Sequence, residues 1–200
     1  MIKAVVFDFG NVICRFDNRI VLQKIAGLTG KTVEELNGLI YQSSTLVNEY
    51  EMGLIDSKQF FNRISLLCNL NVSKEEFVAL YTNKFNPIWE TFSLIEKLKL
   101  QYKLGLVSNT SEMDFEHGIK TTRVFTLFDA VTLSYQVHAL KPSRQLYDDI
   151  LRKLSVKPDE CIYVDDILEN AASATSLGMH GMQFTTSSQL ENSLKRLGVG

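Results

Sequence analysis

Five short runs of β-branched and other apolar residues recur along the chain, each bounded by polar or turn-forming residues. Apolar runs of this length are typical of strands buried on both faces of a sheet. The segments between the later runs have apolar residues spaced three or four apart, which is the periodicity of an amphipathic helix. The five predicted strands are Val5–Phe7, Lys103–Val107, Ala130–Leu133, Cys161–Val164 and Gly181–Phe184.

Strands that alternate with helices predict a parallel sheet joined by right-handed crossovers. The fold class expected from this pattern is α/β, a doubly wound parallel sheet. The helices predicted after Pro87 cover residues 88–98, 113–119, 143–154, 171–177 and 189–197.

From residue 17 to about Asn86 the chain shows helical periodicity and no convincing strand. Helices are expected there after Asp17, Thr32, Asp56 and Ser73, with a further helix from Ser44 to Met52. An all-helical insertion therefore divides the chain into an α/β core domain, residues 1–15 and 87–200, and a helical domain, residues 16–86.

Composition narrows the class of protein. The 200 residues are 45% hydrophobic and 22% charged with a net charge of −2, so nucleic acid and anionic membranes are not expected partners. The apolar runs are too short to span a bilayer, and the first strand begins too early to leave room for a secretory signal. Three widely spaced cysteines among apolar residues suit buried thiols. The expected location is cytoplasmic.

Polar side chains follow three of these apolar runs, and a lone cation precedes one of the predicted helices. Asp8 ends the first strand, and Gly10 allows a tight turn after it. A carboxylate at the carboxyl end of a central parallel strand points into the crevice where such sheets bind ligands. Asp8 alone is equally typical of a loop cap, and three later stretches change that balance.

The later stretches carry a hydroxyl with an amide, a lone cation and a pair of acids, in that order. Ser108 and Asn109 follow the second strand, Lys141 precedes a proline and a helix, and Asp165 and Asp166 end the fourth strand. Each stretch by itself is also typical of a turn or a solvated surface. Together with Asp8 they closely resemble the four motifs of the haloacid dehalogenase-like hydrolase superfamily.

The resemblance covers essentially the whole chain and implies a phosphatase acting on a small phosphorylated metabolite. It implies that Asp8 is the nucleophile, forming an aspartyl-phosphate that is later hydrolysed. It also implies a Mg²⁺ ion held by Asp8, the Gly10 carbonyl and the acid pair, with Asp166 as the direct ligand and Asp165 beside it or through water. The helical insertion resembles the cap of the superfamily's first subclass, and the first strand should lie at the centre of the sheet.

The phosphoryl group itself would meet the remaining motif residues. Ser108 and the backbone around Asn109 would donate hydrogen bonds to its oxygens, and Lys141 would neutralise its charge and orient Asp8. Asn170 is expected to face the same loop and orient Lys141 or the acid pair.

One position departs from the commonest pattern of the superfamily. Most of its phosphatases read Asp-x-Asp, and the second acid protonates the leaving oxygen; here that position is Gly10. Loss of a general acid costs about 10²–10⁴-fold in rate. The stretch Asp-Phe-Gly-Asn resembles a subgroup that includes phosphatases of hexose phosphates such as glucose 1-phosphate.

Two other functions stay open. A 2-haloacid dehalogenase uses the same nucleophile on carbon and lacks the second acid, but it does not keep an acid pair for magnesium. A protein that binds a metabolite without turnover would also explain Gly10, although unpaired charges in a crevice are costly to keep.

Several other side chains are candidates for contact with the substrate or for the core. Arg15, Asn18, Glu51 and Arg63 could reach polar groups of a substrate or simply face solvent, and His138 lies near Lys141. Trp89 and the pair Phe60–Phe61 are expected in the core.

Overall fold

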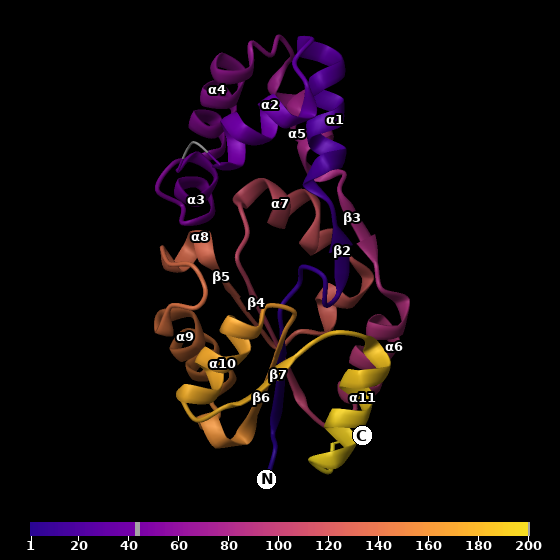
Figure 1. Ribbon diagram of the computed structural model, residues 1–200. Helices are drawn as coiled ribbons and strands as arrows, with labels where there is room; N and C mark the ends of the chain where they lie inside the picture. Colours follow the sequence, from indigo (N-terminus) through magenta and orange to yellow (C-terminus); the bar gives the residue numbers. More distant parts are fainter. Residues whose placement is uncertain (43–44, 200) are drawn as a thin grey trace.

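The computed structural model describes residues 1–42 and 45–199. A five-stranded parallel sheet in the order β5-β4-β1-β6-β7 forms its core, which confirms the predicted fold class and the central place of the first strand (Figure 1). The central strand pairs on both sides, so Phe7 lies beside Leu106 on one side and Val164 on the other. The strands are β1 (Ala4–Phe7), β4 (Lys103–Ser108), β5 (Ala130–Leu133), β6 (Cys161–Asp165) and β7 (His180–Gln183).

Alternate residues of β1 face two separate hydrophobic clusters, because successive side chains of a strand point to opposite faces. Val5 and Phe7 belong to a cluster with residues of α6 (Trp89–Leu98) and α11 (Ser187–Arg196). Ala4 and Val6 belong to a second cluster with residues of α9 (Arg144–Leu154) and α10 (Leu168–Ser176). The sheet is thus the middle layer of three.

A helical unit lies beyond the carboxyl ends of the strands (Figure 1). It has its own buried cluster, which includes Leu36, Phe60 and Phe77 and is joined by Met113 from the α/β part. Its elements are α1 (Asn18–Thr29), α2 (Val33–Asn37), the π-helical turn η1 (Gly38–Gln42), α3 (Leu46–Glu51), α4 (Ser57–Cys68) and α5 (Lys74–Thr82).

The predicted starts of four of these helices are confirmed by their capping bonds. The side chains of Asp17, Thr32, Asp56 and Ser73 each accept a hydrogen bond from a backbone N–H in the first turn. The predicted start of α3, Ser44, lies outside the described residues. The domain boundaries at residues 16 and 87 stay a prediction.

Short elements complete the α/β part. Helix α7 (Glu112–His117) follows β4, and α8 (Ser134–Val137) follows β5. Single 3₁₀ turns are η2 (Ile119–Thr121), η3 (Arg123–Leu127) and η4 (Pro158–Glu160).

A two-stranded antiparallel ribbon connects the α/β part with the helical unit. Strand β2 (Cys14–Phe16) leads out, and β3 (Phe85–Pro87) leads back. The expectation of no strand before Asn86 was wrong at its end, because β3 begins at Phe85. Three-residue strands carry too few residues for a sequence periodicity to reveal them.

Two expectations about side chains have different outcomes. The cysteines Cys14, Cys68 and Cys161 are buried free thiols, as predicted. Trp89 was expected in the core, but it is 59% exposed because it starts α6 at the outer end of the ribbon. Among the described residues, no helix is long and apolar enough to cross a membrane.

The end of α3 is joined to α8 by a close backbone contact. The Ser134 hydroxyl donates to the Glu51 carbonyl at 2.6 Å, and His138 Nδ1 lies 2.9 Å from the Met52 carbonyl. Gly53 has a φ of +65°, and a Cβ built on it would lie 2.2 Å from the Tyr135 carbonyl oxygen. A residue without a side chain is therefore needed where the two units meet.

Gly53→Ala should lower the free energy of unfolding by more than Gly30→Ala, measured by urea denaturation. Both glycines have positive φ, so each change carries a left-handed strain of about 1–2 kcal/mol. Only Gly53 also meets backbone, since nothing lies within 4 Å of a Cβ at Gly30. Equal losses in the two variants would contradict a close contact between α3 and α8.

Candidate active site

Asp8 lies at the carboxyl end of the central strand, where the sequence predicted it. Its N–H continues the sheet by donating to the Val164 carbonyl at 2.8 Å, and its Oδ1 accepts from the Phe9 N–H at 2.7 Å. Three residues after Asp8, Asn11 has a φ of +54°, a conformation that asparagine tolerates better than most residues. The backbone thus turns sharply and leaves the Asp8 carboxylate at the end of the sheet.

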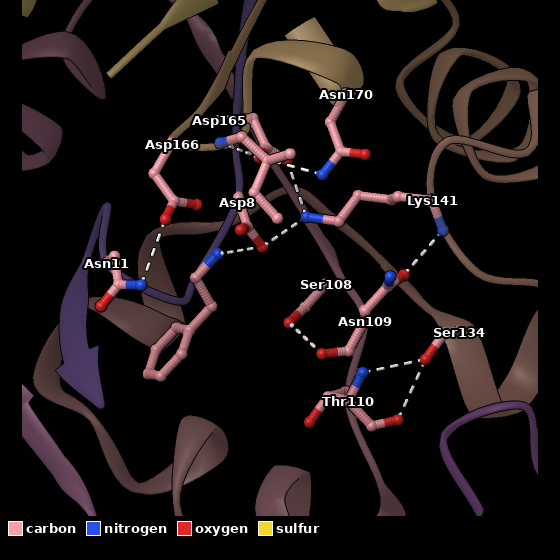
Figure 2. A network of polar contacts seen from close by, with 12 residues as sticks. Asp8, Asn11, Ser108, Asn109, Thr110, Ser134, Lys141, Asp165, Asp166 and Asn170 are labelled. Carbon is pink, nitrogen blue, oxygen red and sulfur yellow. Dashed lines mark hydrogen bonds and ion pairs between the residues drawn. The ribbon is translucent and has the colours of Figure 1, made fainter. Parts of the chain in front are cut away.

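The Lys141 ammonium lies between two carboxylates. Its Nζ is 2.7 Å from Asp8 Oδ1 and 2.8 Å from Asp165 Oδ2, and all three side chains are buried (Figure 2). Lys141 comes from the loop before α9, whereas the two acids end the neighbouring strands β1 and β6. The fold therefore brings Asp8 together with two residues that lie more than 130 positions later in the sequence.

Burial and charge act in opposite directions on these groups. Burial raises the pKa of Asp8 to about 7, and the nearby Lys141 ammonium only partly opposes it. Burial lowers the pKa of Lys141, but Asp8 and Asp165 outweigh it and hold that pKa above its ordinary value. Lys141 is therefore a fixed positive charge, whereas the charge of Asp8 depends on what else lies beside it.

Asp165 uses both of its oxygens within the protein. Oδ2 accepts from the Tyr163 hydroxyl at 2.6 Å as well as from Lys141, and Oδ1 accepts from the Ile167 N–H at 2.9 Å and the Asn170 amide at 3.0 Å. Asn170 thus orients the acid pair through Asp165. Tyr163 was missed from the sequence, although its position two residues before Asp165 puts both side chains on one face of β6.

Asp166 is less constrained than its neighbour. It is only partly buried, and its Oδ2 accepts one hydrogen bond, from the Asn11 amide at 3.1 Å (Figure 2). Carboxylate oxygens of Asp8, Asp165 and Asp166 all lie within 4.8 Å of one another. The Gly10 carbonyl accepts no hydrogen bond from the described part of the chain.

This donor set suits a hard divalent cation such as Mg²⁺, which prefers oxygen ligands. The three carboxylates outnumber the single ammonium of Lys141, so the cluster carries uncompensated negative charge when all three are ionised. Asp166 and the Gly10 carbonyl have free oxygen lone pairs, whereas those of Asp165 are largely engaged.

Ser108 and Asn109 lie beside this cluster, at the end of β4. Ser108 is 3% exposed and its hydroxyl makes a long contact of 3.4 Å with the Asn109 carbonyl. The Asn109 side-chain oxygen accepts from the Lys141 N–H at 2.8 Å, which fixes the loop that carries the lysine. No pattern in the sequence indicates this role of Asn109.

A pocket of about 440 Å³, including its open mouth, lies between this loop and the helical unit. Gly10, Ser108 and Asn109 line it from the α/β part, and Asn18 and Glu51 line it from the helical unit. Of the four side chains considered for substrate contact, these last two reach the pocket. Arg15 and Arg63 do not line it, and Arg63 pairs with Glu49 at 2.8 Å.

The chain is similar to known proteins over most of its length. Residues 5–183 match the model of the haloacid dehalogenase-like hydrolase family. A D-ribitol-5-phosphate phosphatase of Bacteroides thetaiotaomicron is 27% identical over 190 residues, covering 92% of both chains. A sesquiterpene phosphatase of Aspergillus oryzae is 27% identical over 189 residues, covering 92% of this chain and 91% of that protein.

Solved structures with the same fold include an enzyme in complex with magnesium and phosphate and a haloacid dehalogenase. A haloacid dehalogenase family enzyme of Bacteroides thetaiotaomicron, in complex with magnesium and inorganic phosphate, superposes with a TM-score of 0.82 at 22% identity, over 92% of this chain and 95% of that one. An L-2-haloacid dehalogenase of Xanthobacter autotrophicus superposes with a TM-score of 0.67 at 17% identity, over 100% and 85%. These likenesses concern the fold.

The family model spans all five strands of the sheet and every motif residue described above, from Asp8 to Asp166. The structure gathers those residues at one edge of the sheet, as members of one site. This chain belongs to the haloacid dehalogenase-like hydrolase family.

Proposed function

We propose that the protein is a magnesium-dependent phosphatase that hydrolyses a small phosphorylated metabolite, such as a sugar phosphate, through an aspartyl-phosphate on Asp8. The observation that carries this proposal is the cluster of Asp8, Asp165 and Asp166 with the Lys141 ammonium between two of them. Phosphatases among the relatives of similar length support it.

Asp8 is the nucleophile in this proposal, and Asp8, Asp166 and the Gly10 carbonyl hold the cation. A bound Mg²⁺ supplies positive charge that keeps the Asp8 carboxylate ionised and lets a phosphate dianion approach it. Asp8 Oδ2 attacks phosphorus, the ester oxygen leaves, and water later cleaves the acyl phosphate to regenerate the carboxylate. Lys141 and Ser108 face the phosphoryl oxygens, and Asp165 positions Lys141.

The proton that the leaving oxygen needs has no donor at position 10. A Cβ on Gly10 would lie 2.9 Å from the Phe16 ring, so an aspartate there would require the ring to move. The leaving group must therefore be good, or be protonated by something other than residue 10. Residues 16–86 form the cap that covers the site in this proposal.

The dehalogenase alternative fits the absence of an acid at position 10 but not the charges nearby. A 2-haloacid is itself a carboxylate, and Asp166 with a free oxygen would repel it unless a cation intervened. The acid cluster therefore favours phosphoryl transfer.

Asp8→Asn should lower the rate of phosphate release by at least about a thousandfold relative to the wild type, because the nucleophile is lost. The measurement is steady-state phosphate release from 4-nitrophenyl phosphate and a sugar-phosphate panel, with Mg²⁺ and with chelator. Asp148→Asn, in an exposed i,i+4 ion pair with Arg144, is the matched control.

Chloride release from 2-chloropropionate is followed in the same preparations. Chelator-insensitive chloride release would assign the protein to the dehalogenases. Silence in both assays, with folded protein, would favour a binding function.

Asp166→Asn and Asp165→Asn should separate metal binding from positioning. Asp166→Asn should raise the Mg²⁺ concentration for half-maximal activity by about tenfold to a hundredfold, with little change in stability. Asp165→Asn should lower the free energy of unfolding by on the order of 3 kcal/mol, because it breaks a buried ion pair. Magnesium titration and urea denaturation of both variants measure the difference, and the reverse ranking would contradict these roles.

A further inference from the structure

The pocket next to the phosphoryl site contains a second buried ion pair. Lys84 Nζ lies 2.9 Å from Asp114 Oδ2, and the two side chains are 5% and 7% exposed. Lys84 precedes β3, and Asp114 lies on α7, so the pair joins the helical unit to the α/β part. The Lys84 ammonium also lies 4.1 Å from the centre of the Tyr81 ring. None of these residues belongs to the motifs around Asp8.

Only one of the two carboxylate oxygens of Asp114 has hydrogen-bond partners among the described residues. Its Oδ2 accepts from Lys84 and from the Ser111 hydroxyl at 3.2 Å. Its Oδ1 is buried and has no hydrogen-bond partner among the described residues. Nearly all buried polar atoms in proteins have a partner, so an unpaired carboxylate oxygen in a residue that lines a pocket points to a donor that enters the pocket.

Glu51 adds a second carboxyl group to the same pocket. Its backbone carbonyl is held by Ser134, but its side chain makes no hydrogen bond within the described part of the chain. Burial and, to a smaller extent, the charge of Asp114 raise the pKa of Glu51 to about 7, while Lys84 and Lys141 partly oppose this rise. Glu51 and Asp114 thus interact electrostatically, and the single Lys84 ammonium pairs with Asp114 alone among the described residues.

The nearby phenol of Tyr41 does not fill these acceptors, since it makes no hydrogen bond to either acid within the described part of the chain. Burial raises the pKa of Tyr41 above its ordinary range, and the negative charges of Asp114 and Glu51 add to that effect. Tyr41 lines the pocket with both acids. The walls therefore offer more hydrogen-bond acceptors than the protein itself fills.

We propose that this pocket is a hydroxyl-recognition subsite, in which Asp114 and Glu51 accept hydrogen bonds from the leaving group of a polyhydroxylated phosphate ester. The inference rests on the proposed phosphatase function and narrows its substrate to polyol and sugar phosphates. Hydroxyl groups along a polyol chain donate to Asp114 Oδ1 and Glu51, and their oxygens accept from Lys84 and Asn18.

An apolar leaving group would not meet these needs. A hydrocarbon chain in the pocket would bury Asp114 and Glu51 away from water without supplying a donor. A site built to hydrogen-bond substrate hydroxyls rejects the analogue without them far more strongly than an apolar pocket rejects an added hydroxyl. The two curated relatives described above differ in this property, since one is named for a polyol phosphate and the other for a terpene.

The test compares D-ribitol 5-phosphate with n-pentyl phosphate, which has the same chain length, an alkyl leaving oxygen and no hydroxyls. The wild-type protein with Mg²⁺ should have a kcat/KM for ribitol 5-phosphate at least about a hundredfold higher. Asp114→Asn and Glu51→Leu should each reduce that ratio by about tenfold or more, mainly through KM. Glu51 has no ion pair, so Glu51→Leu keeps the test decisive if Asp114→Asn does not fold.

Glu116→Gln is the matched control, since Glu116 lies on the same helix as Asp114 but pairs with Lys120 at the surface. It should leave the ratio unchanged. A wild-type ratio near one, a preference for 5-aminopentyl phosphate, or a ratio that neither variant alters would overturn the subsite. In those cases phosphate release from 4-nitrophenyl phosphate would still support the phosphatase, whereas no release from any ester would overturn both proposals.

Discussion

The contact of one ammonium with two carboxylates determines how the site is built. Asp8 and Asp165 end adjacent parallel strands, and their side chains are withdrawn from water, so without a cation at least one of them would be protonated. Lys141 supplies that cation at 2.7 Å and 2.8 Å. The surrounding polar groups hold the three charges in place: Asn109 fixes the lysine backbone, and Tyr163 and Asn170 fix Asp165. The cluster is still net negative when its three carboxylates are ionised, so in the proposed reaction a phosphate dianion would need the added charge of a bound cation to approach Asp8.

A second lysine performs a different task between the two units. Lys141 is shared by two acids that the strands bring together, whereas Lys84 pairs with one acid across the junction of the helical unit and α7. The junction is also held by backbone contacts at Gly53 and by the Ser134 hydroxyl, so the ion pair is not its only support. Ion pairs that are replaceable by apolar packing often give little net stability. A buried pair with one oxygen unfilled is therefore better explained by binding than by stability.

The site residues at the ends of strands could be predicted from the sequence. The site residues that meet where the helical unit contacts the α/β part could not. Asp8, Asp165 and Asp166 each end an apolar run, and the carboxyl ends of parallel strands share one edge. Lys84 and Asp114 follow no such rule, because 30 residues separate them and the ribbon β2-β3 brings them together. That ribbon has three residues a strand, too few for a periodic signal. Trp89 looked like a core residue because residue type does not reveal that it lies at a helix start.

The absence of an acid at position 10 is linked to that same ribbon. Phe16 ends β2, and its ring would lie only 2.9 Å from the first atom of any side chain at residue 10. The ring also lines the pocket together with Phe85 of the partner strand and Gly10 itself. An aromatic side chain at this place cannot give a proton to the leaving oxygen. Apolar surface thus lies near the nucleophile where most phosphatases of the superfamily have an acid. The carboxyl groups of Glu51 and Asp114 line the same pocket. In the two proposals, the leaving oxygen and the groups that recognise the leaving group therefore share one pocket, and the ribbon lines that pocket with Phe16 and Phe85.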